Sequence, residues 1–312
     1  MNEEDFLTAL RHLATHPAAR DLRDDAAVVH FGGKNLVLTH DMIVEGVHFL
    51  AHDPAGDVAW KLVAVNLSDL AAKGAKPVAA LLGYTLGSSE WNRAFVSGLE
   101  QALAHFGLPL LGGDTVSVPA GSLKALGLTA IGEAEVVPSR AGAQAGDGIW
   151  VSGCIGDASV GLDISRGRAF GHDDLRRRYR RPEPRLELGR RIAPIATAMM
   201  DVSDGLLLDL DRLAAASGRS AALDLGSVPL SEMFIAVRGQ DRSARIAAAT
   251  GGDDYELLFT LPAGCEGQLQ SLAEQSGTPV TKIGLIGEGA GLTLSDADGH
   301  VPLPARLGYQ HG

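Results

Sequence analysis

Aspartates recur in this sequence beside glycines and at the ends of apolar segments, where their carboxylates could hold a metal ion. Asp41, Asp69 and Asp201 are flanked by apolar residues rather than by loop formers. An isolated aspartate beside glycine is usually a turn former or a helix cap, but these three positions fit the edge of a core. The aspartates placed in this way are Asp24, Asp25, Asp41, Asp69, Asp114, Asp201, Asp204, Asp253 and Asp254.

Carboxylates that converge in a folded protein repel one another. Two unit charges about 4 Å apart cost about 4 kcal/mol at an effective dielectric constant of about 20, so a cluster requires cations. Magnesium takes oxygen ligands and is usually held by one or two carboxylates together with substrate phosphates. Calcium fits less well, because the EF-hand-like stretch 296–299 places its glycine too early and predicts a hairpin turn instead. The pattern therefore favours magnesium.

Two segments could hold a phosphate beside these carboxylates. The sequence has no Gly-Lys-Ser/Thr ending of a P-loop and no protein-kinase catalytic loop. Residues 112–115, Gly-Gly-Asp-Thr, predict a turn after an apolar run, with backbone amides next to a carboxylate. Residues 203–205, Ser-Asp-Gly, open a predicted helix at 206–216, and the amino end of a helix favours phosphate. Neither segment alone is sufficient to identify a phosphate-binding site.

Composition bounds the class of protein. A chain of 312 residues predicts two domains. The sequence contains no run of about 18 apolar residues, so no membrane span is predicted. Residues 1–5 are acidic, whereas a leader peptide would be basic. We therefore expect a cytoplasmic protein. The formal net charge of −11 repels nucleic acid and anionic lipid, so an anionic ligand must arrive with cations.

Two further features have ordinary interpretations. The basic run 176–181 is interpreted as a solvated loop or helix end rather than a nucleic-acid site. Cys154 and Cys265 lack the spacing of a zinc or redox site and are interpreted as buried free thiols.

The elements that must position the aspartates alternate between β and α, which excludes a pure helical bundle or a β-sandwich. A helix predicted at 57–73 carries Asn66, Asp69 and Lys73 on a face separate from its apolar stripe. Linker composition near 138–142 predicts domains at 1–138 and 139–312. Strands are predicted at 26–31, 36–39, 77–86, 108–111, 125–131, 149–152, 221–225, 256–261, 282–286 and 291–294, and further helices near residue 6, at 90–106, and from residues 157, 184 and 204.

Taken together, these segments resemble the thiamine-monophosphate kinase family across nearly the whole chain. Two of the blocks, 66–71 and 201–206, also occur in the wider aminoimidazole-ribonucleotide-synthetase-like superfamily, whereas 46–49 (Gly-Val-His-Phe) and 251–257 point to the kinase. The matching blocks are Asp24–Val28, Thr39–Asp41, Glu45–Phe49, Ala64–Ala71, Gly112–Thr115, Arg140–Ala143, Gly146–Asp147, Arg181–Arg185, Asp201–Leu206 and Gly251–Leu257.

The resemblance implies a mixed α+β fold of two domains, with N-terminal domains pairing in a homodimer and a C-terminal α/β domain. It implies ATP-dependent phosphorylation of thiamine monophosphate to thiamine diphosphate, assisted by several magnesium ions and without an assigned general base. It also implies metal contacts at Asp25, Thr39, His40, Asp41, Asp69, Asp114, Asp201 and Asp204, ATP contacts at Gly113, Asp114, Arg140 and Ser203, and substrate contacts at His48, Asp253 and Tyr309.

Three positions depart from the pattern of that family. Arg23 stands where glycine is usual, His40 where serine or threonine is usual, and Asp253 where glutamate is usual. The last change shortens a carboxylate expected to contact substrate by one methylene, which puts that contact in doubt.

Two other kinds of function remain open from the sequence. A related enzyme of the superfamily is one: a selenophosphate synthetase would need a reactive cysteine near the N-terminus, a carbamoyl dehydratase would need one at its C-terminal end, and a purine-pathway synthetase is a third possibility. This sequence begins without a cysteine and ends Gln310-His311-Gly312. The other is a non-catalytic nucleotide-binding homologue. Measuring ADP formation with different acceptors separates these functions.

Overall fold

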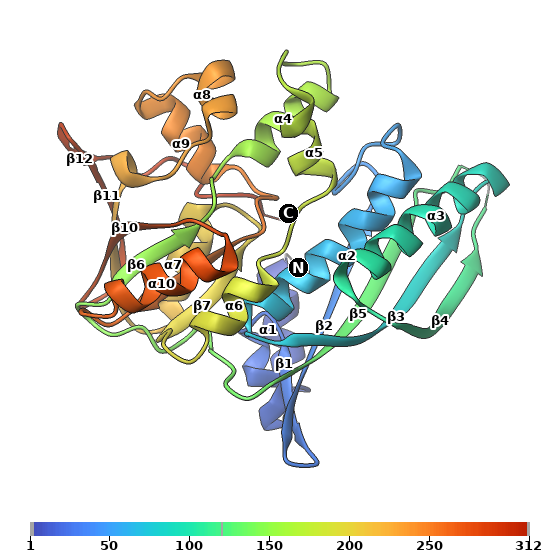
Figure 1. Cartoon of the computed structure of the whole chain (residues 1–312), viewed down its shortest axis with the longest axis horizontal. Coiled ribbons are helices and arrows are strands. Elements are labelled where there is room, and N and C mark those ends of the chain that lie inside the picture. The colour runs from blue at the N-terminus through green and yellow to red at the C-terminus, as the bar shows by residue number, and fades with distance from the viewer. Residues whose placement is uncertain (1–2, 120, 311–312) are drawn as a thin grey trace.

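The computed structural model describes residues 3–119 and 121–310 and consists of two lobes (Figure 1). Met1 and Asn2 of the acidic start, and His311 and Gly312 at the other end, lie outside the described residues. The N-terminal lobe is built around one β-sheet and the C-terminal lobe around another. The predicted boundary at residue 138 falls between the last strand of the first sheet and the first strand of the second.

In the described residues, the first sheet has the strand order β1-β2-β5-β3-β4 and is antiparallel except for the β3/β4 pair. Gly32 and Gly33 form the hairpin turn that connects β1 to β2. Two long helices pack on this sheet, preceded by a short helix and a 3-10 turn. The bounds are α1 (Glu3–Arg11), η1 (Pro17–Leu22), β1 (Ala27–Phe31), β2 (Lys34–Val44), α2 (Ala55–Ala72), β3 (Lys76–Leu86), α3 (Ser89–Phe106), β4 (Leu110–Ser117) and β5 (Ala125–Ala134).

The second sheet, within the same described ranges, has the order β12-β11-β8-β10-β6-β9-β7, and its β8/β11 pair is parallel. The helices of the C-terminal lobe pack around this sheet, and the sheet lies at the end of the molecule opposite α3 (Figure 1). The bounds are β6 (Gly148–Ser152), α4 (Asp157–Ser165), α5 (Asp173–Arg180), α6 (Leu186–Ile192), β7 (Ala198–Val202), α7 (Leu206–Ala216), β8 (Ser220–Asp224), η2 (Leu225–Ser227), α8 (Glu232–Arg238), α9 (Arg242–Thr250), β9 (Glu256–Leu261), α10 (Glu266–Ser276), β10 (Val280–Gly287), β11 (Gly291–Asp296) and β12 (Gly299–Val301).

Helix α2 is the element that joins the lobes. Nearly all of its side chains are buried, because alanine, valine and leucine occupy every face. It packs on β2, β5 and α3 of its own lobe and also on α6 and β7 of the other lobe. The few polar side chains that it carries therefore lie inside the protein and at the junction.

The turn predicted at residues 112–115 is wrong, because these residues lie within strand β4. Gly113 has a φ of 154°, and a Cβ placed on it would lie 1.9 Å from the backbone oxygen of Leu82. Glycine is required there because β4 runs very close to β3. The same composition that suggests a turn thus permits a tightly paired edge strand.

Two other interpretations can be compared with the structure. The basic run forms the end of α5 and the residue after it, so the interpretation as a helix end is confirmed, but only part of the run is exposed to solvent. Arg180 lies 2.8 Å from Asp53 and Arg181 lies 2.5 Å from Asp57, so this run binds acidic groups at the start of α2. Cys154 and Cys265 are free thiols, as expected, but are half-buried rather than fully buried. Among the described helices, none is both long and apolar enough to cross a membrane.

Close contact between α2 and α3 makes Gly98 a sensitive position. A Cβ on Gly98 would lie 2.2 Å from the Cα of Gly56, where only backbone atoms could move aside. We expect Gly98→Ala to lower the free energy of unfolding by about 2 kcal/mol, measured by chemical denaturation. The matched control is Gly267→Ala in α10, which meets no atom within 4 Å and should be neutral or slightly stabilising. Equal denaturation midpoints for the two variants would contradict this account of the helix contact.

Candidate active site at the junction of the lobes

Three buried carboxylates converge where α2 meets the second lobe. One ligand oxygen from each of Asp25, Asp69 and Asp201 can be chosen so that all three lie within 4.8 Å of one another. Asp25 precedes β1, Asp69 lies in α2 and Asp201 lies in the buried strand β7. The side chain of Asp25 is only 3% exposed, and the other two residues are also buried. Residues far apart in the chain thus form one acidic site.

The polar stripe predicted on α2 faces this site. Asn66 accepts a hydrogen bond from the backbone N–H of Asp41 at 2.9 Å, and the hydroxyl of Thr39 donates to Asp69. Lys73 lies 2.7 Å from Asp25. Because β2 alternates its side chains between the two faces of the sheet, Thr39 and Asp41 point to the same side as these helix residues.

Cations balance one of the three carboxylates. Burial would raise the pKa of Asp25, but the ammonium of Lys73 and the guanidinium of Arg140 outweigh it and lower the pKa to about 2. Burial alone would lower the pKa of Arg140, but the charges of Asp25 and Asp24 outweigh the loss of solvent and raise it. Asp25 is therefore ionised in the folded protein at any ordinary pH.

The other carboxylates are not balanced in this way. Burial, followed by repulsion from Asp41 and Asp201, raises the pKa of Asp69 well above its ordinary value. Burial and the charge of Asp25 raise the pKa of Asp201 in the same direction. Burial also raises the pKa of Asp41, to about 6. No lysine or arginine in the described ranges forms an ion pair with Asp69 or Asp201, so negative charge accumulates at this point.

The donor set fits a hard divalent cation. All of the converging ligand atoms are carboxylate oxygens, with the hydroxyl of Thr39 beside them. Magnesium is bound by such oxygens, whereas structural zinc sites are made mainly of cysteine and histidine. A bound Mg²⁺ would supply the positive charge that Asp69 and Asp201 lack.

The start of α7 forms one border of the acidic site. The side chain of Asp209 accepts hydrogen bonds from the backbone N–H groups of Ser203, Asp204 and Gly205, at 3.0 to 3.2 Å. Burial raises the pKa of Asp209 to about 7. The helix start predicted at Ser203-Asp204-Gly205 is confirmed, but an internal carboxylate already satisfies the amides that we expected to be available to a phosphate. The carboxylate of Asp204 is paired with Arg212.

The residues implied as substrate contacts lie at a second border. His48 accepts a hydrogen bond on Nδ1 from the backbone N–H of Val44 at 3.1 Å. Asp253 bonds the ammonium of Lys61 at 2.8 Å and the hydroxyl of Tyr255 at 3.1 Å. The backbone N–H of Tyr309 donates to the carbonyl of Asp204 at 2.8 Å, which brings the end of the chain to the acidic site.

Three implied site residues are not brought to the carboxylates. Gly113 and Asp114 lie on the exposed edge strand β4. The side chain of His40 points to the face of the sheet opposite Thr39 and Asp41, where its Nδ1 lies 2.9 Å from the hydroxyl of Thr129. The reason is the two-residue period of a strand, which sends neighbouring side chains to opposite faces.

Several side chains of the site were not identified from the sequence. Ser68 donates to Asp201 at 2.5 Å, and Arg20 lies 2.6 Å from Asp24. Lys61 and Ser68 are seven residues apart on α2, so they lie on one helix face. Polar residues with that spacing on an otherwise apolar helix are the signal that could have identified this pair.

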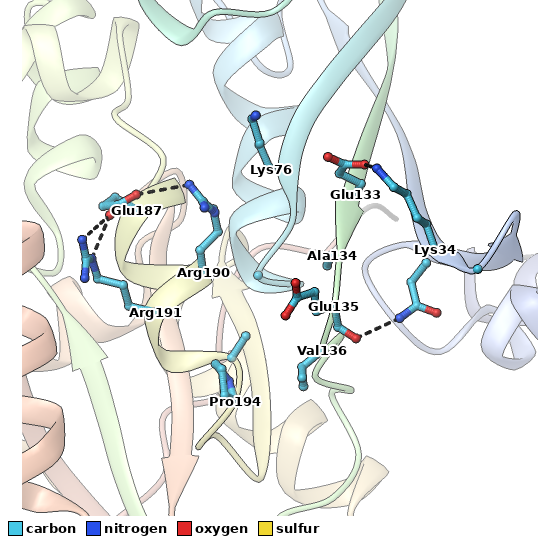
Figure 2. Close-up of a pocket in the computed structure, with 14 residues that line it drawn as sticks. Lys34, Lys76, Glu133, Ala134, Glu135, Val136, Glu187, Arg190, Arg191 and Pro194 are labelled. Atoms are coloured by element: carbon cyan, nitrogen blue, oxygen red, sulfur yellow. Dashed lines mark hydrogen bonds and ion pairs between the residues drawn. The ribbon is translucent and has the colours of Figure 1, made fainter.

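A cavity of about 760 Å³ lies elsewhere, between α6 and the ends of β2 and β5. Figure 2 shows that several of its charged groups are paired with one another: Lys34 lies 2.6 Å from Glu133, and Arg191 lies 2.6 Å from Glu187. None of the converging carboxylates lines it. The cavity and the acidic cluster are therefore separate features of this protein.

Comparison with known families agrees with this two-lobe architecture. The family model described as AIR synthase related protein, N-terminal domain, matches residues 23–134, and the corresponding C-terminal domain matches residues 144–297. A thiamine-monophosphate kinase of Caulobacter vibrioides is 40% identical over 307 residues, which cover 95% of this chain and 86% of that protein. This chain belongs to the thiamine-monophosphate kinase family.

Solved structures of the family have the same fold. Thiamine-monophosphate kinase from Stenotrophomonas maltophilia K279a is 37% identical, with a TM-score of 0.79 over 96% of each chain. AaThiL complexed with AMPPCP and TMP is 29% identical, with a TM-score of 0.84 over 99% of this chain and 97% of that one. The mixed α+β, two-domain fold class predicted from the sequence is confirmed.

The unbalanced acidic charge predicts that the folded protein binds magnesium in solution. We expect Mg²⁺ to raise the midpoint of thermal unfolding, and to raise it more at about pH 7.5 than at about pH 5.5. Burial raises the pKa of Asp69 and Asp201, so protons compete with the metal as the pH falls. The matched variant Asp201→Asn should show a smaller shift, measured by calorimetry. The same magnesium shift in both proteins would show that the ion binds somewhere else.

Proposed function

We propose that this chain transfers the γ-phosphoryl group of ATP to the phosphate of thiamine monophosphate, yielding thiamine diphosphate. The observation that supports this most directly is the cluster of Asp25, Asp69 and Asp201, in which cations balance Asp25 alone. Two polyanions can meet there only if divalent ions bind first. The relatives named above are thiamine-monophosphate kinases, and AaThiL has been solved with AMPPCP and TMP.

The metal-binding residues in this proposal are Asp25, Asp69 and Asp201, with Asp41 and Asp204 near them. Thr39 orients Asp69 by donating a hydrogen bond to it, and Asn66 fixes the backbone of Asp41. Bound magnesium ions would neutralise the phosphate oxygens and polarise the γ-phosphoryl group toward the acceptor. A phosphate monoester has a second pKa near about 6, so the attacking oxygen is already ionised at neutral pH and no general base is required.

Arg140 is the positive side chain that the protein contributes beside the metals. Arg140 lies in the segment that connects β5 of the first lobe to β6 of the second, and its guanidinium donates a hydrogen bond to Asp25. A guanidinium presents several donors in one plane, so it can hold a carboxylate and a phosphate together. We assign Arg140 to the ATP phosphates, and Ser203 to the same nucleotide from the second lobe.

The acceptor is assigned to the border formed by His48, Asp253 and Tyr309. Tyr309 is half exposed, so its ring is accessible from solvent. An aromatic ring facing the cationic thiazolium of thiamine would contribute about 0.5 to 2 kcal/mol. We place this activity in the cytoplasm, where ATP and magnesium are available together.

The carboxylates can be tested by removing one charge. We expect Asp69→Asn to lower kcat by about a hundredfold or more, because the amide cannot replace a charged metal ligand in the transition state. The measurement is ADP release with thiamine monophosphate as acceptor, with and without magnesium.

The exposed Asp174 at the start of α5 provides the control, and Asp174→Asn should keep normal turnover. Near-normal turnover of Asp69→Asn at saturating magnesium would contradict the assignment of this residue. ATP binding without ADP release from the unmodified protein would instead favour a non-catalytic homologue.

The first sheet also supports a homodimer. Apolar side chains are exposed along β3 and the edge strand β4, with Leu81 41% and Leu111 68% exposed. Such a group of apolar residues is typical of a protein interface. We propose that the N-terminal lobes of two copies pair here. Asp114 and Gly113 lie on the same strand, so their surroundings in the working enzyme depend on that pairing.

Leu111→Asp tests the dimer. We expect it to shift the protein from dimer to monomer in analytical ultracentrifugation at micromolar concentration, because a charge in the interface loses its water. Val96 on α3 is 62% exposed on the helical side of the lobe, and Val96→Asp is the control that should leave the mass unchanged. A monomeric unmodified protein would contradict the proposed pairing.

A further inference from the structure

Lys61 is a lysine buried inside the junction between the lobes. Its side chain is only 2% exposed. A buried ammonium is costly unless it is paired and hydrogen-bonded, and this one has three partners. It donates to the backbone oxygen of His48 at 2.9 Å and to Asp253 at 2.8 Å, and it lies 4.2 Å from the ring centre of Tyr179.

These partners belong to different lobes. His48 lies in the turn 45–49 that follows β2, whereas Asp253 precedes β9. The backbone N–H of His48 bonds the carbonyl of Val44 at 2.9 Å, and that of Gly46 bonds the carbonyl of Phe49 at 2.8 Å, so the turn is compact. Lys61 therefore connects the two residues assigned to the acceptor through a single side chain.

The segment around Asp253 has an unusual backbone. Asp253 has a φ of 70° and Tyr255 a φ of 52°, a region that is unfavourable for a tyrosine. Several bonds hold the segment in this state: Asp254 accepts from the N–H of Gly156 at 3.0 Å, and the N–H of Tyr255 donates to Val202 at 2.8 Å. The backbone thus directs Asp253 toward α2, and Lys61 meets it there.

We propose that Lys61 is a positioning residue that sets the geometry of the acceptor end of the site. It fixes the carboxylate of Asp253 from one side, while the hydroxyl of Tyr255 fixes it from the other. It holds the turn of His48 at the same time. This inference rests on the proposed function, because it concerns how thiamine monophosphate is bound.

The position on α2 explains why the acceptor end alone is affected. Lys61 lies two helical turns before Ser68, which bonds Asp201, and three turns before Lys73, which bonds Asp25. The metal-binding residues are thus held by other side chains of the same helix. Removing the ammonium of Lys61 leaves those contacts in place.

The ammonium of Lys61 also fixes the position of the shorter carboxylate at residue 253. Aspartate stands here where the family that the sequence resembles usually has glutamate. Lys61 and Tyr255 each take one carboxylate oxygen of Asp253, whose side chain is 24% exposed. The carboxylate is therefore held against the protein rather than extended into solvent, and its distance from the acceptor depends on where Lys61 holds it.

The test compares the Michaelis constants of the two substrates. Lys61→Met keeps most of the length of the side chain and removes its charge. We expect the KM for thiamine monophosphate to rise about tenfold or more, with the KM for ATP changed by less than about twofold. Lys282→Met is the matched control, because Lys282 on β10 also lies near an aromatic ring and a carboxylate but has a side chain that is 43% exposed. It should leave both constants unchanged.

A second variant covers the case in which Lys61→Met does not fold. The double variant with Lys61→Met and Asp253→Asn removes both buried charges and leaves neither without a partner. In this protein the KM for thiamine monophosphate should be close to that of Asp253→Asn alone, because both changes remove the same contact. A KM far above that of Asp253→Asn would overturn the positioning role without requiring folded Lys61→Met. Where Lys61→Met does fold, the rise should be smaller than the product of the rises in the two single variants.

Each outcome has a separate meaning. A folded Lys61→Met protein with unchanged KM values, or with both constants raised equally, would overturn the positioning role while leaving the kinase activity intact. Multiplicative effects in the double variant would overturn it as well. No ADP from the unmodified protein with thiamine monophosphate would overturn the proposed function and the inference that rests on it.

Discussion

Repulsion between buried carboxylates is the constraint on which this structure depends. Asp25, Asp69 and Asp201 meet in a place that water does not reach freely, so each raises the free energy of the others. Lys73 and Arg140 offset the charge of Asp25 alone. The protein therefore folds around a site that still lacks positive charge. The extensive apolar packing of α2 offsets the electrostatic repulsion between these carboxylates in the folded state.

Helix α2 meets this constraint by dividing its polar residues between two faces. Asn66, Asp69 and Lys73 face β2 and the segment before β1, whereas Lys61 and Ser68 face the second lobe. Apart from Gly56 and Asp57 in the first turn, the other positions of the helix are apolar and buried. Neither lobe contains a complete site, because each supplies carboxylates to a helix that contacts both. The site exists only where the lobes meet.

Local sequence patterns were enough to predict those parts of the site that depend on periodicity. Asp69 was identified because aspartate in the middle of an apolar helix is unusual, and Ser203-Asp204-Gly205 because such residues begin helices. Lys61 and Asp209 were not identified, since their partners lie 192 residues away in one case and in backbone amides in the other. Asp114 was placed in a turn because a Gly-Gly pair suits turns and close strands equally well.

Ion pairs at the other end of α2 complete the argument. Arg180 and Arg181, from the second lobe, bind Asp53 and Asp57 near the start of this helix, and Asp53 also accepts a hydrogen bond from Tyr179. Tyr179 packs its ring against Lys61. A rotation of one lobe against the other would break these contacts and would change the spacing of the carboxylates at the same time. Arg180 and Arg181, which belong to one basic run in the sequence, therefore fix the position of one lobe relative to the other and with it the spacing of the carboxylates in the site.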